Sequence, residues 1–409
     1  MQTNLASWAC DTDQGREADA ILRRCVHCGF CTATCPTYQV LGDELDSPRG
    51  RIYLIKQVLE GAEPTLATQQ HLDRCLTCRN CETTCPSGVQ YGHLIDIGRN
   101  VVDQKVQRPW RDRMRRALLR KGLNSALFAP AMRAGQMLRG LLPQALKRKV
   151  PQRRDPGPLP DTARHARQVL MLAGCVQPAM MPTIDAATIR VLDAVGIGAR
   201  LSSAGCCGAV NFHLDAQAEA LDQMRANIDA WWPAVERGEI EAIVMNASGC
   251  GAMVKEYAHH LRHDARYAER AARIVELVKD VAEIVAPHAQ ALRERLAPGG
   301  RAAFHPPCTL QHWQGLRPLS ERLLVELGFE LQPFADSHLC CGSAGAYSVL
   351  NPGMALELRD RKLAAITPHA PPVIVSSNIG CVSHLQSGTE IPVRHWIEVV
   401  DERLRGLRA

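Results

Sequence analysis

The sequence predicts an α+β / α/β multidomain protein: a helical N-terminal domain, a basic helical segment, and then two pseudo-symmetric α/β repeats. Three observations predict this organisation. Eight of the 17 cysteines form two similar blocks within residues 21–100. Residues 101–165 are rich in arginine and lysine and are broken by prolines. Beyond them, two sets of four cysteines recur at a nearly constant offset, which indicates a duplicated unit. The expected segments are 1–20 (N-terminal segment), 21–100 (helical domain), 101–165 (basic helical segment and linker), 166–300 (repeat 1) and 301–409 (repeat 2).

The N-terminal domain contains two C-x₂-C-x₂-C-x₃-C-P runs, which end at Pro36 and Pro86. Three thiolates at this spacing can reach three irons of one cubane, and the fourth reaches the neighbouring cluster. Zinc also uses CxxC pairs, but a pair of zinc sites does not explain the third cysteine, the fourth and the proline in both runs. We therefore expect a ferredoxin-like domain with two [4Fe–4S] clusters. The predicted ligands are Cys25, Cys28, Cys31 and Cys85 for one cluster, and Cys75, Cys78, Cys81 and Cys35 for the other. Cys10 lies outside the pattern and is expected to be a free thiol.

The residues between the two runs predict a helix over Asp46–Glu60. Ile52, Ile55, Val58 and Leu59 share one face of it. This connection is longer than a small bacterial ferredoxin needs, and it resembles the cluster domain of iron–sulfur subunits in flavin-linked dehydrogenases.

The basic segment concentrates the positive charge of the chain. Residues 105–154 hold 15 Lys or Arg and one acid, Asp112, so their net charge is +14 against −8 for the rest of the protein. One interpretation is a solvated linker. A second is a set of short amphipathic helices over residues 117–149 that dock on an anionic membrane, and a third is a surface that binds an acidic partner protein. Aromatic residues make up only 4% of the chain, which argues against a nucleic-acid partner.

The two repeats place their cysteines after short apolar runs. Residues 168–173, 242–245 and 372–376 read as buried parallel strands, and residues 215–231 and 356–366 read as helices. The cysteines then lie in loops at strand ends, where α/β sheets place their sites. We expect each set to converge and hold a further iron–sulfur cluster or a zinc ion. The first set is Cys175, Cys206, Cys207 and Cys250, and the second is Cys308, Cys340, Cys341 and Cys381. Among nearby histidines, His384 is the preferred ligand candidate.

Several classes of protein are excluded by what the sequence lacks. Residues 1–15 hold no apolar segment of the kind a secretory signal needs. No apolar run reaches the roughly 18 residues of a membrane span. We therefore expect a cytoplasmic protein whose thiols stay reduced and bind metal. Neither a G-x-G-x-x-G loop nor a G-x₄-G-K-[ST] loop occurs at a helix start, and no catalytic residues or organic-cofactor ligands are assigned.

The residues around both cysteine pairs follow a pattern found in other proteins. Gly205-Cys-Cys-Gly208 and Leu339-Cys-Cys-Gly342 resemble the duplicated CCG domain of heterodisulfide reductases, anaerobic glycerol-3-phosphate dehydrogenases, lactate-utilisation proteins and glycolate oxidases. With the run from Leu22 to Pro36 and the Asp46–Arg51 stretch ahead of them, residues 20–400 closely resemble the family of glycolate oxidase iron–sulfur subunits. One departure is that Met253 and His384 stand where the full heterodisulfide-reductase pattern has a fifth cysteine.

This resemblance implies a subunit of an oxidoreductase complex. Substrate oxidation would lie on an FAD-binding flavoprotein partner, and this chain would pass the electrons through [4Fe–4S] clusters toward a quinone-type acceptor. The complex would be cytoplasmic or peripheral on the inner face of the cytoplasmic membrane. The alternatives are the small subunit of an anaerobic glycerol-3-phosphate dehydrogenase, a CCG-type disulfide-reducing subunit, and a metal-binding scaffold without redox function.

Overall fold

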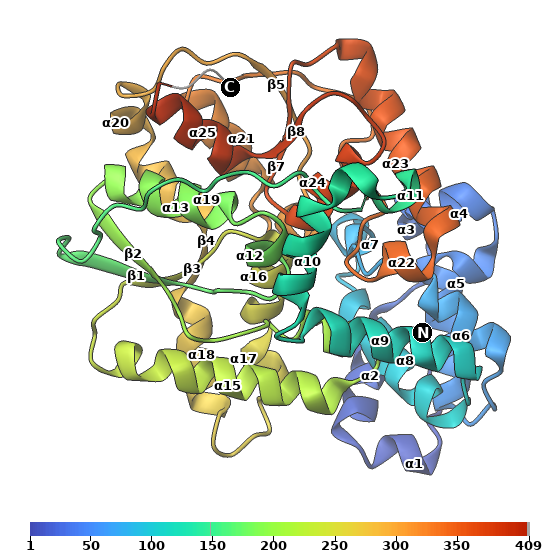
Figure 1. Ribbon diagram of the computed structural model, residues 1–409. Helices are drawn as coiled ribbons and strands as arrows, with labels where there is room; N and C mark the ends of the chain where they lie inside the picture. The colour runs from blue at the N-terminus through green and yellow to red at the C-terminus, as the bar shows by residue number, and fades with distance from the viewer. Residues whose placement is uncertain (148, 407–409) are drawn as a thin grey trace. The chain divides into compact units, whose positions relative to one another are not determined.

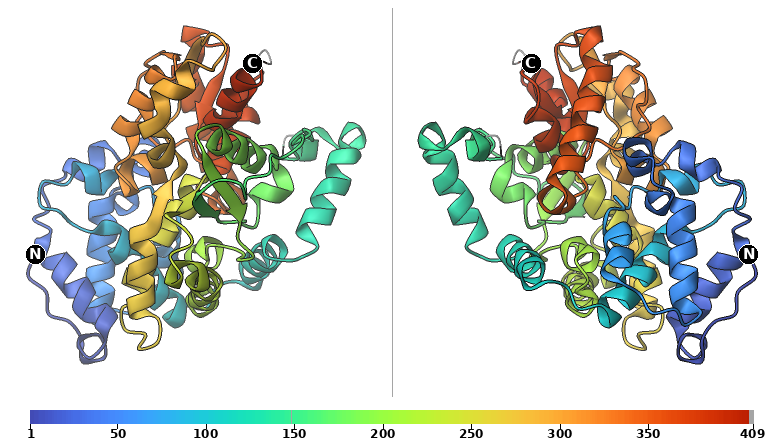
Figure 2. Two further views of the ribbon diagram at one scale, coloured as in Figure 1. Left: turned by 90° about the vertical axis from the view of Figure 1, so that its left-hand side faces the viewer. Right: turned by 90° about the vertical axis from the view of Figure 1, so that its right-hand side faces the viewer.

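The computed structural model (Figures 1 and 2) describes residues 1–147 and 149–406. The chain divides into two compact units. Unit 1 comprises residues 1–118 together with residues 338–362, and unit 2 comprises residues 119–337 and the chain from residue 363 onward. Arg148 of the basic segment and residues 407–409 of the expected second repeat lie outside the described residues. The domain boundaries expected from the sequence stay predictions.

Within its described residues, unit 1 consists of helices and connecting loops and contains no strand. Its elements are α1 (Ser7–Cys10), α2 (Asp13–Arg24), α3 (Phe30–Ala33), α4 (Pro36–Leu41), η1 (Glu44–Asp46), α5 (Pro48–Leu59), α6 (Leu66–Asp73), α7 (Asn80–Thr84), α8 (Tyr91–Lys105), most of α9 (Trp110–Leu123), α22 (Tyr347–Leu350) and most of α23 (Pro352–Ile366).

Helix α5 shows how the sequence specifies this unit. The Ser47 side chain accepts a hydrogen bond from the Gly50 N–H, and Pro48 occupies the first turn, where its missing N–H costs nothing. Ile52, Ile55, Val58 and Leu59 are buried, as the sequence periodicity predicts. This face contributes to one apolar core with α2 and α8, and that core borders the cysteine loops.

The basic segment forms the short helices expected from its sequence. They are α9, α10 (Phe128–Met137), the 3₁₀ turn η2 (Arg139–Leu141) and α11 (Gln144–Lys147). Residues 151–160, the expected linker, contain no helix or strand.

Unit 2 contains two four-stranded parallel sheets with the same strand order (Figure 1). The first runs β2-β1-β3-β4, with β1 Arg167–Met171, β2 Ile197–Leu201, β3 Ala242–Met245 and β4 Val278–Asp280. The second runs β6-β5-β7-β8, with β5 Arg301–Phe304, β6 Glu330–Leu331, β7 Ile374–Ser376 and β8 Val393–His395. Matching order and parallel pairing confirm the predicted duplication and the α/β class.

The helices of unit 2 follow the strands in the alternation typical of α/β folds. They are α12 (Gln177–Met180), α13 (Thr183–Ala194), α14 (Ala209–His213), α15 (Gln217–Glu236), α16 (Ser248–Lys255), α17 (Tyr257–His260), α18 (Ala268–Leu277), α19 (Val281–Val285), η3 (Ala286–His288), α20 (Ala289–Arg293), the π-helical turn η4 (Thr309–Trp313), α21 (Arg317–Glu326), η5 (Thr367–His369), α24 (Ile379–Gln386) and α25 (Trp396–Leu404). The expected helices over 215–231 and 356–366 correspond to α15 and α23.

The two repeats share one apolar core. Side chains of α13 and of both sheets pack with those of α25, and Arg190 on α13 pairs with the buried Asp401 on α25 at 2.7 Å. The cysteine-bearing ends of the repeats also meet inside unit 2. The Ser248 N–H donates to the Ser377 carbonyl oxygen at 3.1 Å, and the Ser248 and Thr309 hydroxyls lie 2.9 Å apart. The segments around Cys250, Cys308 and Cys381 are therefore neighbours.

Candidate metal centres

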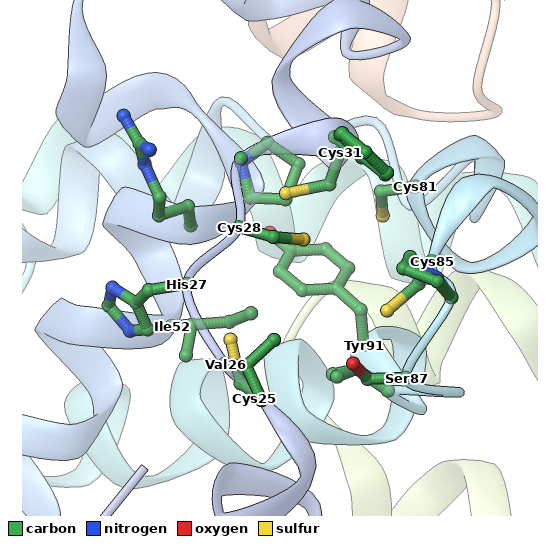
Figure 3. A pocket seen from close by; sticks show the side chains of 16 residues that line it. Cys25, Val26, His27, Cys28, Cys31, Ile52, Cys81, Cys85, Ser87 and Tyr91 are labelled. Carbon is green, nitrogen blue, oxygen red and sulfur yellow. The ribbon is translucent and has the colours of Figure 1, made fainter.

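The first cysteine run surrounds a cavity that we call site A (Figure 3). Cys25 and Cys28 line it from the loop between α2 and α3, and Cys31 lines it from α3 itself. Cys85, the residue that ends α7, lines the same cavity from the second run. The predicted exchange of fourth cysteines therefore agrees with this geometry, while the role of these residues as ligands stays a prediction.

The second run surrounds a neighbouring cavity, site B. Cys75, Cys78 and Cys81 line it together with Cys35, which precedes α4. Pro48, Cys81 and Tyr91 line both cavities, so site A and site B share part of their walls. The two predicted cluster sites are thus adjacent.

Both cysteine loops use the same unusual backbone. His27 and Gly29 in the first loop have φ values of 55° and 85°, and Thr77 and Arg79 at the matching positions of the second loop have 50° and 57°. A left-handed conformation costs about 1–2 kcal/mol for a residue with a Cβ. The turns wrap the chain around each cavity, so strain is concentrated where the cysteines converge.

The donors at both sites fit an iron–sulfur cluster. Burial, followed by the charge of Cys25, raises the pKa of the Cys31 thiol to about 11. Complete burial likewise raises the pKa of Cys81 far above the usual range for a thiol. Such thiols stay protonated until a metal takes the place of the proton. The two sets consist of sulfur donors alone, which suit iron–sulfur clusters, and at site B the Tyr91 hydroxyl donates to Cys75 Sγ at 3.6 Å.

The second cysteine pair, Cys340–Cys341, belongs to unit 1 with these sites. The segment that carries it is held by Asn80 Nδ2, which donates to the His338 carbonyl oxygen at 3.3 Å, and by the Tyr347 hydroxyl, which donates to the Arg74 carbonyl oxygen at 3.1 Å. Burial, countered by the charge of Arg51 and reinforced by the charges of Cys75 and Cys340, raises the pKa of Tyr347. Tyr347 therefore lies within electrostatic reach of site B and of the cysteine pair.

The first set of repeat cysteines converges in unit 2. Cys175 Sγ lies 3.5 Å from Cys206 Sγ, and Cys207 interacts with both Cys206 and Cys250. Hydrogen bonds from Cys175 and Cys207 lower the pKa of the Cys206 thiol, so the group favours one shared thiolate. Their loops are fixed by the Asn227 amide, which donates to the Cys206 carbonyl oxygen at 2.9 Å, and by the Tyr257 hydroxyl, which donates to the Cys207 carbonyl oxygen at 2.8 Å.

The other two cysteines of the second set lie in unit 2. Cys308 precedes the π-helical turn η4, and Cys381 lies in α24. A ring nitrogen of the buried His305 lies within 4.8 Å of Cys381 Sγ. The sequence favours His384, which lies in α24, and includes His305 only among the other histidines near the cysteines. The signal was the position of His305 directly after β5, at a strand end, where repeat 1 has Leu172.

Cys10 is exposed and its thiol donates to the Leu5 carbonyl oxygen at 3.5 Å. Within the described residues, no helix combines the length and the apolar character needed to cross a membrane.

Comparison with known proteins covers the whole chain. Residues 21–89 match the family described as a 4Fe-4S dicluster domain, and residues 169–255 and 302–386 match the family described as a cysteine-rich domain. The chain is 53% identical over 412 residues to the glycolate oxidase iron-sulfur subunit of Escherichia coli (strain K12), covering 99% of each chain. It is 32% identical over 403 residues to the probable glycolate oxidase iron-sulfur subunit of Bacillus subtilis (strain 168), covering 90% of this chain and 89% of the relative. Lactate utilization protein A of Geobacillus thermodenitrificans is 25% identical over 247 residues, covering 58% of this chain and 99% of the relative.

Proposed function

We propose, because this chain belongs to the family of glycolate oxidase iron–sulfur subunits, that it is the electron-transfer subunit of a flavin-dependent glycolate or 2-hydroxy acid dehydrogenase complex. Its partner would be an FAD-binding flavoprotein that oxidises the substrate. A quinone-type molecule would accept the electrons. The catalytic steps on the substrate would then lie outside this chain.

The observation that carries this proposal is the adjacency of sites A and B. Two four-cysteine sites that share Cys81 and Tyr91 as a common wall leave a short path between two one-electron carriers. Reduced FAD holds two electrons, whereas a [4Fe–4S] cluster bound at either site accepts one electron at a time. A pair of such sites suits the stepwise discharge of a flavin.

The residues of the chain have separate roles in this scheme. The cysteines would hold the two clusters, and the left-handed loop turns fix their directions. Tyr91 donates a hydrogen bond to Cys75 and helps to close both cavities against water. The converging cysteines of repeat 1 would hold a further cluster or a zinc ion.

The first experiment is metal and spectroscopic analysis of the chain, purified without oxygen together with its partner. Two [4Fe–4S] centres require about eight iron and eight labile sulfide per chain. Reduction by glycolate, through the flavoprotein, should produce the electron paramagnetic resonance signals of reduced clusters. Cys28→Ser and Cys78→Ser should each remove a different signal. Protein that contains zinc alone, or clusters that glycolate cannot reduce, would contradict the proposal.

Only part of the basic segment has the exposed apolar and basic residues that a membrane-binding surface needs. Trp110, Met114 and Leu118 form an exposed row on α9, with exposed fractions of 60%, 48% and 64%. The exposed residues Arg111, Arg113 and Arg115 flank this row. Arginines beside exposed apolar groups suit an anionic lipid surface. We therefore place the peripheral membrane contact on this face of α9.

Two other arginines of the segment do not take part in such a surface. Arg108 and Arg116 are buried, and both pair with Asp73. The Arg116–Asp73 distance is 2.9 Å. These charges stabilise the fold of unit 1, which excludes the interpretation of the whole segment as a solvated linker.

Charge reversal tests the membrane proposal. The triple variant Arg111→Glu, Arg113→Glu, Arg115→Glu should lose binding to anionic liposomes while the flavoprotein stays bound. The matched control reverses three exposed arginines elsewhere, Arg164, Arg237 and Arg273, which are 59%, 60% and 55% exposed. If the first variant keeps its liposome binding and loses the flavoprotein instead, the face is a subunit interface.

A further inference from the structure

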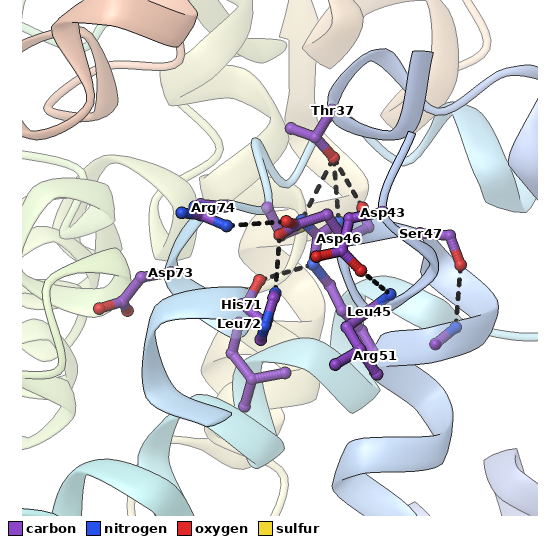
Figure 4. Close-up of polar contacts among 12 residues, drawn as sticks. Thr37, Asp43, Leu45, Asp46, Ser47, Arg51, His71, Leu72, Asp73 and Arg74 are labelled. Carbon is purple, nitrogen blue, oxygen red and sulfur yellow. Dashed lines mark hydrogen bonds and ion pairs between the residues drawn. The ribbon is translucent and has the colours of Figure 1, made fainter. Parts of the chain in front are cut away.

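A buried ion-pair network lies beside site B, in the Asp46–Arg51 stretch (Figure 4). The side chains of Asp46 and Arg51 are 0% and 1% exposed, and they pair at 3.2 Å. Arg74 pairs with the other carboxylate oxygen of Asp46 at 2.8 Å. Two arginines thus share the Asp46 carboxylate, while a ring nitrogen of His71 lies 3.3 Å from it and a carboxylate oxygen of the exposed Asp43 lies within 4.8 Å.

Arg51 is the member of this network that places a positive charge at the cavity. It lines site B, and two of its nitrogens donate to the Thr37 hydroxyl oxygen at 3.2 Å each. That oxygen lies 3.2 Å from Cys35 Sγ. The Arg51 Nε also donates to the His71 carbonyl oxygen at 2.7 Å, so the side chain is held in place. The Arg51 guanidinium stays protonated at ordinary pH, and its pairing with the buried Asp46 carboxylate offsets the cost of burying that charge.

Site A has no equivalent buried cation in the described structure. Arg49 lines it from the same stretch of chain, but its side chain is 37% exposed and pairs with Glu44 at 2.7 Å. The Met1 amino group, which donates to the Cys25 carbonyl oxygen at 2.6 Å, is only partly buried. Charges in contact with water are screened, whereas a fully buried charge acts through a low dielectric.

We infer that Arg51 is a buried counter-charge of site B and raises the reduction potential there. The buried Arg79 lines the same cavity, but it lies 3.9 Å from the carboxylate of Glu82. This inference rests on the proposed electron-transfer function. An electron that arrives at site B adds one negative charge to a site where burial disfavours charge. The Arg51 guanidinium offsets that cost, so its charge favours the reduced state at site B and has little effect at site A.

Four variants test this role by redox titration of the whole complex, followed by electron paramagnetic resonance. Arg51→Gln removes the charge and should lower the equilibrium constant for reduction at site B by about tenfold or more, which is about 59 mV for a one-electron couple. Arg51→Lys keeps the charge and should restore most of the potential. Asp46→Asn removes the compensating carboxylate and should shift the potential of site B upward. Arg49→Gln is the matched control and should leave the potential of site B unchanged.

The opposite signs for Arg51→Gln and Asp46→Asn separate a charge effect from structural damage, which would move both variants in the same direction. If Arg51→Gln fails to retain iron, the inference is tested by Asp46→Asn alone, which should raise the reduction potential of site B. Equal shifts at both sites, or shifts of the same sign in the two variants, would overturn the inference. Wild-type protein without clusters would instead contradict the proposed function. Cys28→Ser and Cys78→Ser assign the signals to sites A and B.

Discussion

At the scale of single residues, the glycine that follows each cysteine pair has a clear physical reason. Gly208 and Gly342 have φ values of 92° and 87°, which favour glycine strongly. A Cβ on Gly208 would lie 3.2 Å from the Ala220 carbonyl oxygen, and one on Gly342 would overlap the Ala355 carbonyl oxygen. The glycine therefore lets each cysteine pair approach the helix that follows it.

Alanine substitutions should show this difference in stability. Gly208→Ala should lower the free energy of unfolding by about 1–2 kcal/mol from its left-handed backbone alone. Gly342→Ala should lower the free energy of unfolding by more, because the added Cβ would also displace the backbone at Ala355. Gly353→Ala, at an exposed position with nothing within 4 Å of the added Cβ, is the control and should cost nothing. Chemical denaturation followed by circular dichroism measures all three, and equal losses for Gly342→Ala and Gly353→Ala would refute the packing argument.

At the scale of elements, the junction between β4 and α19 contains a buried carboxylate. Asp280 ends the strand and caps the helix, accepting from the Ala282 N–H at 2.9 Å. Burial raises the pKa of Asp280 to about 7, although the Ala282 N–H acts in the opposite direction. The folded state therefore binds a proton that the unfolded state releases near its ordinary pKa of about 3.9. The contribution of Asp280 to stability falls as the pH rises from about 4 to about 7.

Asp280→Asn should remove this pH dependence while keeping a side chain that can cap the helix. The wild-type protein should gain stability relative to Asp280→Asn as the pH falls from 7 to 5, by an amount on the order of 2–3 kcal/mol. Thermal unfolding at several pH values measures the difference. Asp222→Asn, whose carboxylate is 74% exposed, is the control and should track the wild type. A constant difference between wild type and Asp280→Asn would contradict the raised pKa.

Local sequence patterns predict the helices and the cysteine sites, but they do not predict which charged residues become buried. The period of Ile52, Ile55, Val58 and Leu59 predicts α5, and the cysteine spacing predicts the crossed sites, because both patterns are local or repeated. The burial of Arg51 and Arg116 depends on contacts with residues distant in sequence. Composition and local spacing therefore cannot distinguish these two arginines from exposed ones. Sequence alone does not rank His305 above the other histidines near the cysteines, because its proximity to Cys381 arises only when β5 and β7 pair.

At the scale of the whole molecule, the division into units does not follow the order of the sequence. Residues 338–362 carry the second cysteine pair, yet they form a compact unit with residues 1–118. The hydrogen bond from Tyr347 to Arg74 joins positions 273 residues apart. We expect this segment to open and close together with the helical N-terminal region, as a single cooperative unit.

Hydrogen exchange of the whole protein tests this grouping. Leu72→Ala, in the core of unit 1, should speed amide exchange across residues 347–362, because a core truncation of this kind costs about 2–5 kcal/mol. Met224→Ala, in the core of repeat 1 within unit 2, should leave that segment protected. If exchange at 347–362 responds to Met224→Ala and not to Leu72→Ala, the grouping is wrong.

The placement of residues 338–362 has a consequence for biosynthesis. Residue 362 follows residue 118 by 244 positions. At about 5–20 residues per second, the ribosome needs roughly 12–50 s to translate that interval. During that time all eight cysteines of the two C-x₂-C-x₂-C-x₃-C-P runs have left the ribosome without the segment that completes their unit. The nascent chain therefore offers these thiols to the cluster-assembly machinery, and to oxidants, before translation ends.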